Sequence, residues 1–407
     1  GIKGCQIQMV DNLNREKGTF KDGLFDTAAI AGKNLWSSLD KKLQEYGELL
    51  MKGKRGSIVA IEPSTGEILC LVTSPSYDPS LLVGRERGEN YMKLEKDSIN
   101  KPLFNRALMA QYPPGSTFKL VNALIGQEEK VIDRNTRYGC NMGFAYGNRV
   151  LGCHPHPSPL DLVPSIQVSC NAYYCRLLKA VLENRTKYKS TKEAYDAWYQ
   201  KVLSFNFGKK FNSDLPYELT GNIPTSEYYD RIYGENRWKA TTIISISIGQ
   251  GEILTTPVQL ANMVAIIANK GFYYPPHLVK SIGHQDSINT RYNTKQYVDV
   301  DSLYFIPVIE GMEKAATSGT VRRAAIPGIS MGGKTGTAQN PHGKDHSILV
   351  SYAPLDKPKI AISVIVENAG FGATWAGPIT SLMIEKYLND TVIRKDLEAH
   401  IINSIIH

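Results

Sequence analysis

Apolar residues follow a strand-like pattern in two regions that lie far apart in the sequence. Residues 57–61 and 67–73 are rich in isoleucine, valine and leucine, and they flank Pro63-Ser64-Thr65-Gly66, a segment typical of a hairpin turn. Residues 347–353 and 359–366 have a similar composition. We expect these four runs to pair in one antiparallel sheet.

The middle of the chain has helical spacing instead. Residues 257–271 are largely apolar, begin with proline and end with glycine, which predicts a buried helix. Residues 118–125 predict another helix directly after the chain-breaking Pro113-Pro114-Gly115. Residues 36–46 predict a Ser-capped amphipathic helix. Residues 375–388 predict a helix that covers the sheet.

These elements predict an α+β topology. The first and last thirds of the chain share one sheet, and a mainly helical segment, about residues 116–310, is inserted between them. That arrangement places Ser116 and Lys334 on opposite walls of one cleft.

Composition and charge exclude a few classes of protein. The chain has 407 residues, 42% hydrophobic and 21% charged, which is ordinary for a globular protein with one large domain and a smaller one. The net charge of +8 is modest and no dense Lys/Arg block is present, so we do not expect nucleic-acid binding. No run of 18 apolar residues and no signal peptide is visible.

Three short strings carry the candidate chemistry. They are Ser116-Thr117-Phe118-Lys119, Ser169-Cys170-Asn171 and Lys334-Thr335-Gly336-Thr337. Each is weak alone, but their order matches the S-x-x-K, S-x-N and K-T-G motifs of serine acyltransferases that react with β-lactams. Together they predict a covalent acyl-enzyme mechanism.

The first string supplies a nucleophile and a base. Ser116 is expected at a helix N-terminus, where free N–H groups favour developing negative charge. Lys119 lies three residues on and shares its helical face. A lysine is normally protonated at neutral pH, so we hypothesise that burial and the nearby Lys334 lower its pKa. Taken alone, the string would more often mark a capped helix with a surface lysine.

The other two strings supply proton transfer and substrate binding. Ser169 is expected to relay a proton between Lys119 and the leaving amine, and Asn171 to hold a substrate amide. The third string predicts an edge strand along which a peptide pairs as an extra strand, helped by the missing side chain of Gly336. Lys334 with the hydroxyls of Thr335 and Thr337 is expected to bind a terminal carboxylate, and the N–H groups of Ser116 and Thr337 to form an oxyanion hole. The ordinary alternatives are a polar turn for the second string and a glycine-rich loop for the third.

The strings and their surroundings resemble the class B penicillin-binding proteins, most closely the elongation-type transpeptidases called penicillin-binding protein 2. The resemblance covers about residues 50–390 and includes the predicted hairpin, Ser74-Pro75-Ser76-Tyr77-Asp78-Pro79, Asn105-Arg106-Ala107, and Gly249-Gln250-Gly251 with Thr255-Thr256-Pro257. It implies a penicillin-binding/serine β-lactamase-like fold, with a five-stranded antiparallel sheet flanked by helices. The implied domains are a pedestal remnant and linker (1–50), a transpeptidase domain (51–390, with the helical subdomain at about 116–310) and a C-terminal tail (391–407).

The activity that this resemblance implies is D,D-transpeptidation in cell-wall elongation. A peptidoglycan stem peptide ending in D-Ala-D-Ala acylates Ser116, D-Ala leaves, and an amine from a neighbouring strand accepts the acyl group. No cofactor takes part in this chemistry, and β-lactams are expected to acylate the same serine. The alternatives are a β-lactam sensor domain, a D,D-carboxypeptidase or a β-lactamase.

A cysteine cluster begins between the first two strings and ends just beyond the second. Four of the six cysteines fall between residues 140 and 175, with two histidines among them, which suggests a tetrahedral zinc site. The resemblance implies the ligands Cys140, Cys153, His156 and Cys170. His154 and Cys175 are rival ligands, and a disulfide or plain buried thiols are alternatives to a metal.

The family also implies a location and partners. Gly1-Ile2-Lys3-Gly4 resembles the end of the family's pedestal, so we expect a soluble fragment without its anchor. The intact protein is expected at the bacterial inner membrane with a periplasmic catalytic domain. Its expected partners are a SEDS-type glycosyltransferase and a pedestal-binding elongation factor.

Overall fold

One antiparallel sheet joins the two ends of the sequence. In the computed structural model, which describes residues 1–284 and 290–406, its strand order is β11-β12-β13-β4-β5. The strands are β4 (Gly56–Ile61), β5 (Ile68–Ser74), β11 (Gly332–Ala338), β12 (His346–Ala353) and β13 (Ile360–Val366). All four strands expected from the apolar runs are confirmed, and the third string lies on β11 at one edge of the sheet, as predicted.

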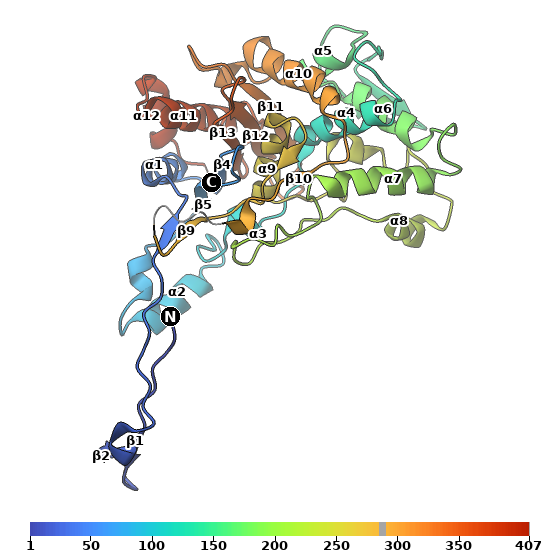
Figure 1. Cartoon of the computed structure of the whole chain (residues 1–407). Coiled ribbons are helices and arrows are strands. Elements are labelled where there is room, and N and C mark those ends of the chain that lie inside the picture. The colour runs from blue at the N-terminus through green and yellow to red at the C-terminus, as the bar shows by residue number, and fades with distance from the viewer. Residues whose placement is uncertain (285–289, 407) are drawn as a thin grey trace.

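Helices cover both faces of this sheet (Figure 1). The buried helix α9 (Pro257–Ala268) packs against β4, β12 and β13 on one face, while α1 (Lys41–Met51) and α11 (Ala376–Asn389) pack on the other. Side chains alternate between the two layers along each strand. Val59 of β4 therefore belongs to the core on the α9 side, whereas Ile58 belongs to the core on the α11 side. The predicted helices at 257–271 and 375–388 are confirmed.

The central region is mainly helical, as expected. Besides α9, its helices are α4 (Lys119–Glu128), α5 (Leu162–Gln167), α6 (Asn171–Leu182), α7 (Thr191–Ser204), α8 (Ser226–Tyr233) and α10 (Phe305–Ser318). It also contains a hairpin that the sequence patterns did not predict, β6 (Gly143–Tyr146) with β7 (Arg149–Gly152). Two further helices, α2 (Arg87–Lys96) and α3 (Arg106–Met109), precede this region, and β8 (Phe272–Tyr273) pairs with β10 (Gln296–Tyr297).

The N-terminal segment extends away from the rest of the chain (Figure 1). Its first hairpin, β1 (Gln8–Val10) with β2 (Glu16–Thr19), lies at the end of an extended arm in Figure 1. The arm returns through β3 (Leu35–Ser37), which pairs with β9 (Val279–Ile282). The predicted Ser-capped helix at 36–46 was wrong in its start, because α1 begins at Lys41 and is capped by Asp40, whose carboxylate accepts the Leu43 N–H. Ser38 is instead buried and donates to the carbonyls of Ile68 and His277.

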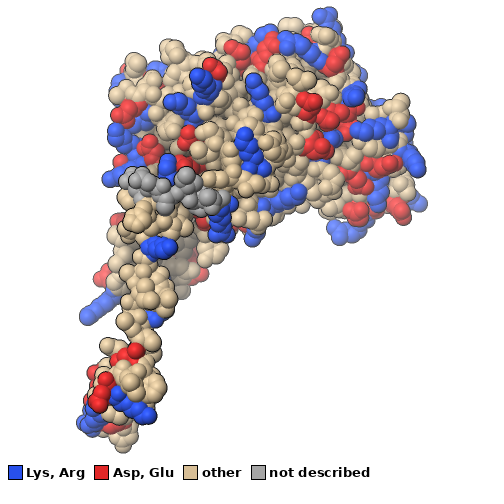
Figure 2. Space-filling model, viewed as in Figure 1, with Lys and Arg blue, Asp and Glu red and all other residues tan. Residues whose placement is uncertain are grey.

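The C-terminal tail forms a short helix, α12 (Lys395–Asn403), beside α1 and α11. The buried Lys54 donates to the carbonyls of Ile401 and Ser404 at the end of this helix, which anchors it. Within residues 1–284 and 290–406, no helix has the length and apolar character needed to cross a membrane. Basic and acidic side chains are interspersed over the face shown in Figure 2.

Candidate active site

The candidate nucleophile lies in a tight turn held against the edge of the sheet. Ser116 belongs to a 3-10 turn, Gly115–Phe118, that leads directly into α4, close to the expected helix start. Gly115 has φ +56°, and its N–H donates to the Gly249 carbonyl at 2.9 Å. A Cβ on Gly115 would lie 2.5 Å from the Thr337 carbonyl oxygen. Only glycine allows this turn to approach β11 so closely, and the approach brings Ser116 to the third string.

Two fully buried lysines meet at one serine hydroxyl. Lys119 Nζ donates to the Ser169 carbonyl (2.7 Å), to Ser169 Oγ (3.2 Å) and to Asn171 Oδ1 (2.6 Å). Lys334 Nζ donates to Ser169 Oγ at 2.7 Å and to the Thr335 carbonyl at 3.1 Å. The Ser169 hydroxyl therefore bridges the first and third strings, a position suited to proton transfer.

Burial changes the acidity of both lysines. Burial lowers the pKa of Lys119 to about 8, because an ammonium group loses its hydration inside the protein. Burial, together with the charge of Lys119, holds the pKa of Lys334 well below its usual range. The predicted lowering of the Lys119 pKa by burial is thus present. The repulsion between the two lysines, which was expected to lower the same pKa, instead lowers the pKa of Lys334.

The second string adopts a conformation that a sequence pattern does not reveal. Ser169 has φ +60°, Cys170 caps α6 by accepting the Tyr173 N–H, and Asn171 is the first residue of that helix. The side chain of Asn171 donates to the Gly152 carbonyl at 2.7 Å while accepting from Lys119. Its amide is fixed by both bonds, so it presents a defined edge to the cleft.

The edge strand β11 forms the opposite wall. Thr335 and Thr337 alternate along it and line the cleft. Gly336 lies on β11 as expected, and the structure gives a second reason for a glycine there, beside the expected room for a peptide. A Cβ there would lie 2.9 Å from the Pro114 carbonyl oxygen and 2.9 Å from Thr117 Cγ2, so the glycine seats the strand against the nucleophile's turn.

The structure brings the predicted residues into one cleft of about 370 Å³. Six of them line it directly, namely Ser116, Ser169, Asn171, Thr335, Gly336 and Thr337, and the two lysines lie buried behind them. Other residues that line it had no predicted role in the cleft, among them Gln250, Asp345 and Phe371, and His154 was expected only as a rival metal ligand. Gln250 belongs to a Gly-Gln-Gly string that marked the resemblance, and its side chain donates to the Thr337 carbonyl at 2.8 Å.

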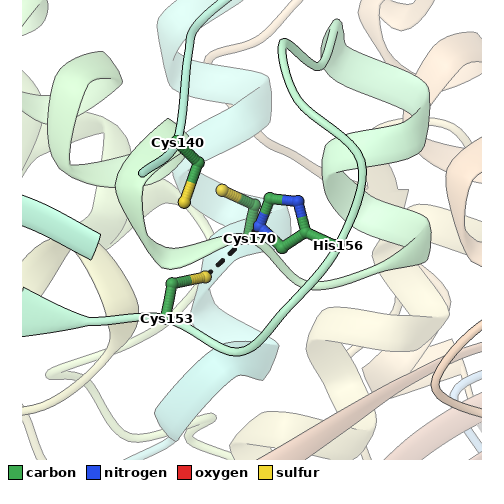
Figure 3. A group of neighbouring side chains, drawn as sticks. All are labelled: Cys140, Cys153, His156 and Cys170. Carbon is green, nitrogen blue, oxygen red and sulfur yellow. Dashed lines mark hydrogen bonds between the residues drawn. The ribbon is translucent and has the colours of Figure 1, made fainter. Parts of the chain in front are cut away.

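The cysteine cluster lies directly behind the second string. Figure 3 shows Cys140, Cys153, His156 and Cys170 pointing toward a common centre, and their ligand atoms lie within 4.8 Å of one another. The structure selects His156 over His154, which lines the catalytic cleft instead. It also separates Cys175, whose buried sulfur lies 3.4 Å from Ser247 Oγ.

The chemistry of this donor set suits a zinc ion. His156 Nδ1 lies 2.7 Å from the Pro157 carbonyl, which leaves Nε2 for the centre, where it lies 3.4 Å from Cys153 Sγ. Hydrogen bonding from the Cys170 thiol holds the pKa of Cys153 well below its usual range, and the Asn171 N–H donates to the same sulfur at 3.2 Å. Three sulfurs and one imidazole nitrogen are a common tetrahedral zinc set.

Comparison with known proteins agrees with this geometry. A family model described as penicillin binding protein transpeptidase domain matches residues 56–385, a segment that contains all three strings. The peptidoglycan D,D-transpeptidase MrdA of Acinetobacter baumannii is 34% identical over 367 residues, which cover 85% of this chain and 52% of that protein. The chain spans about half the length of the curated relatives it matches.

Solved structures are similar in fold as well as sequence. The crystal structure of Pseudomonas aeruginosa PBP2 in complex with WCK 5153 has a TM-score of 0.77 and 32% identity, covering 88% of this chain and 76% of that one. A complex between PBP2 and MreC from Helicobacter pylori has a TM-score of 0.77 and 25% identity, covering 94% and 69%. These likenesses confirm the expected fold class and the resemblance inferred from the strings.

Proposed function

Because the chain belongs to the family of penicillin-binding-protein transpeptidase domains, we propose that it is the catalytic part of an elongation-type peptidoglycan D,D-transpeptidase. The observation that carries this proposal is the meeting of Lys119 and Lys334 at the Ser169 hydroxyl, beside Ser116 in one cleft. Each element of a serine acyl-transfer site is then within reach of one bound peptide.

Acylation begins at Ser116. Its oxygen attacks the carbonyl carbon of the penultimate D-Ala, while its proton passes to the neutral amine of Lys119. The pKa of about 8 leaves part of Lys119 unprotonated near neutral pH, which an ordinary lysine would not. The N–H groups of Ser116 and Thr337 bind the oxygen that becomes negatively charged.

The leaving group departs through the second string. The carbon–nitrogen bond to the terminal D-Ala breaks, and a proton from Lys119 reaches the departing amine through the Ser169 hydroxyl. An amine of a second stem peptide then attacks the acyl-enzyme, loses a proton along the same route and releases Ser116. Asn171 holds the substrate amide, and Lys334, Thr335 and Thr337 hold the terminal carboxylate.

Penicillin provides the first test. Intact-protein mass spectrometry after mixing with excess benzylpenicillin should show a stable one-to-one adduct in the wild type and in Ser98→Ala, an exposed serine control. Ser116→Ala should show no adduct. Rapid loss of the drug without an adduct would indicate a β-lactamase instead.

A second assay separates the transpeptidase from its alternatives. Exchange of the terminal D-Ala of a synthetic donor for an added D-amino acid requires an amine acceptor site. A carboxypeptidase would yield only hydrolysis, and a sensor domain would bind β-lactam with neither product. Exchange that depends on Ser116 supports the proposal.

We further propose that Cys140, Cys153, His156 and Cys170 hold a structural zinc ion. When bound, the metal supplies rigidity through Cys170, the central residue of the second string, and takes no part in the acyl transfer. Native mass spectrometry should find one Zn²⁺ per chain. A wild-type protein that binds no zinc and keeps full acylation would contradict this role.

Location and partners follow from the relatives by analogy. The structure of Helicobacter pylori PBP2 with MreC leads us to propose an MreC-type elongation factor as a partner of the intact protein. We propose that the intact protein also has a membrane anchor, places this domain in the periplasm and acts with a SEDS-type glycosyltransferase. Co-purification of the full-length protein with each partner tests these assignments.

A further inference from the structure

A single carboxylate faces the catalytic cleft. Of the described residues that line it, Asp345 is the only one with an acidic side chain. It follows β11 in the chain and immediately precedes β12, beyond the pair Ala338–His346 that ends the ladder. Continuing this register places Asp345 opposite Gln339, which also lines the cleft. Their side chains therefore share the face of Thr335 and Thr337.

The structure holds Asp345 in place without neutralising it. Its Oδ1 accepts the Asn340 N–H at 3.2 Å, and its carbonyl accepts the Gly370 N–H at 2.8 Å. Within the described chain, no Lys, Arg or His nitrogen forms an ion pair with it inside 4.0 Å, although 19 such contacts exist elsewhere. A carboxylate in a substrate cleft, fixed by its backbone and free of a cation, is suited to bind a cation from the substrate.

The position of Asp345 along the strand indicates which part of the substrate it meets. A donor peptide that pairs with β11, with its terminal carboxylate near Thr335, has its reacting carbonyl near Thr337. The preceding residue then lies beside Gln339, about 7 Å further along at the usual rise of about 3.4 Å per residue. Asp345 lies across β11 from that position, on the β12 side and about two strand spacings (about 10 Å) away, so a long donor side chain that passes over Gln339 can reach it.

We propose that Asp345 binds a primary ammonium group on the side chain of the donor residue that precedes the D-Ala pair. This inference rests on the proposed function. Cross-linking joins stem peptides of the same kind, so the amine that serves as acceptor in one strand is also present in the donor. The acceptor's own ammonium is the other possible source, and the experiment separates the two.

The donor arm compares two peptides that differ in one charge. Nα-acetyl-L-lysyl-D-alanyl-D-alanine carries a free ε-ammonium, and its Nε-acetylated form does not. We expect the wild type to release D-Ala from the charged peptide about threefold to tenfold faster, measured as kcat/KM. Asp345→Asn should abolish this preference because it removes the negative charge. The asparagine oxygen can still accept the Asn340 N–H, so the turn is kept. Asp345→Glu should retain part of it.

Asp356→Asn is the charge-matched control. Asp356 is exposed in the loop between β12 and β13, at the other end of β12, and its removal should leave the preference unchanged. Equal rates for the two peptides in the wild type, or a preference that persists in Asp345→Asn, would overturn the inference. With a neutral donor, Asp345→Asn could change only the ratio of amine transfer to hydrolysis. That result would assign the carboxylate to the acceptor and overturn the donor placement.

Acylation by benzylpenicillin distinguishes this failure from failure of the proposed function. Benzylpenicillin has no ammonium group, so Asp345→Asn should form the Ser116 adduct at the wild-type rate. An absent adduct in the wild type would contradict the acyl-transfer mechanism itself, whereas a normal adduct with no charge preference would contradict only the role of Asp345.

Discussion

Gly336→Ala is the substitution that best tests how the cleft is built. A Cβ at this position would lie 2.9 Å from both the Pro114 carbonyl oxygen and Thr117 Cγ2, and 3.2 Å from Ile348 Cβ. Reaching an ordinary contact of 3.4 Å requires the strand and the turn to separate by about 0.5 Å. The Pro114 oxygen belongs to the backbone and cannot rotate away as a side chain could. The turn and β11 must therefore move apart, which widens the spacing between Ser116 and Thr337.

The expected cost appears in both activity and stability. Because a misplacement of about 1 Å costs on the order of 100-fold in rate, half that distance should slow acylation by benzylpenicillin about tenfold. Overpacking should lower the free energy of unfolding by about 1–3 kcal/mol, partly offset by the reduced freedom of alanine in the unfolded chain. The acylation rate is measured by timed intact-mass spectra, and stability by urea denaturation.

Gly88→Ala provides the matched control for the change from glycine to alanine. Gly88 lies in α2 with no heavy atom within 4 Å of an added Cβ, so the same change should leave acylation unaltered. If Gly336→Ala acylates within twofold of the wild type at unchanged stability, the glycine does not set the spacing of the cleft. Slower reaction with peptide donors but not with penicillin would instead support the expectation that Gly336 leaves space for the bound peptide.

Three further predictions address the lysines and the cysteine cluster. If the neutral form of Lys119 is the base, as proposed, its pKa of about 8 predicts that acylation falls about tenfold per pH unit below pH 8. A flat profile between pH 6 and 8 would contradict this role. Lys54→Met removes three hydrogen bonds to carbonyl oxygens and should lower the free energy of unfolding by about 1–3 kcal/mol in urea, whereas the exposed Lys52→Met should change it by less than about 0.5 kcal/mol. Cys140→Ser should reduce the zinc content seen by native mass spectrometry and slow penicillin acylation about 10- to 100-fold. Unchanged acylation in the zinc-free variant would show that the cluster does not support the active site.

Much of the fold was predictable because its strands and helices carry their own local signals. The apolar runs of β4, β5, β12 and β13 are long enough to identify singly, and the proline and glycine at the ends of 257–271 mark α9. The runs also predicted that the two ends of the sequence share one sheet, whereas the order of its strands came only from the structure. The hairpin of β6 and β7 was missed because its two strands have four residues each and no alternation of apolar and polar positions. The start of α1 was predicted too early because Asp40, rather than a serine, caps it.

The candidate site was predictable in its residues but not in its contacts. The order of the strings identifies Ser116, Lys119 and Lys334, since each carries a functional group at a fixed spacing. Which atom lies between the two lysines depends on the backbone of Ser169, whose positive φ has no signal in the sequence. Asp345 was not noticed because it reaches the cleft only through the register of β11 with β12.

The second string shows why the cluster and the lysines form one structural unit. A non-glycine residue at positive φ costs on the order of 1–3 kcal/mol, so Ser169 needs compensating contacts. Lys119 supplies them by donating to both its carbonyl and its hydroxyl, while Cys170 caps α6 and Cys153 accepts the Asn171 N–H. Lys119 therefore holds in place the residue whose hydroxyl we propose as its partner in proton transfer. A loss of acylation in Lys119→Ala consequently combines a missing base with a released Ser169, and the two effects separate only when the variant's thermal stability is measured beside its rate.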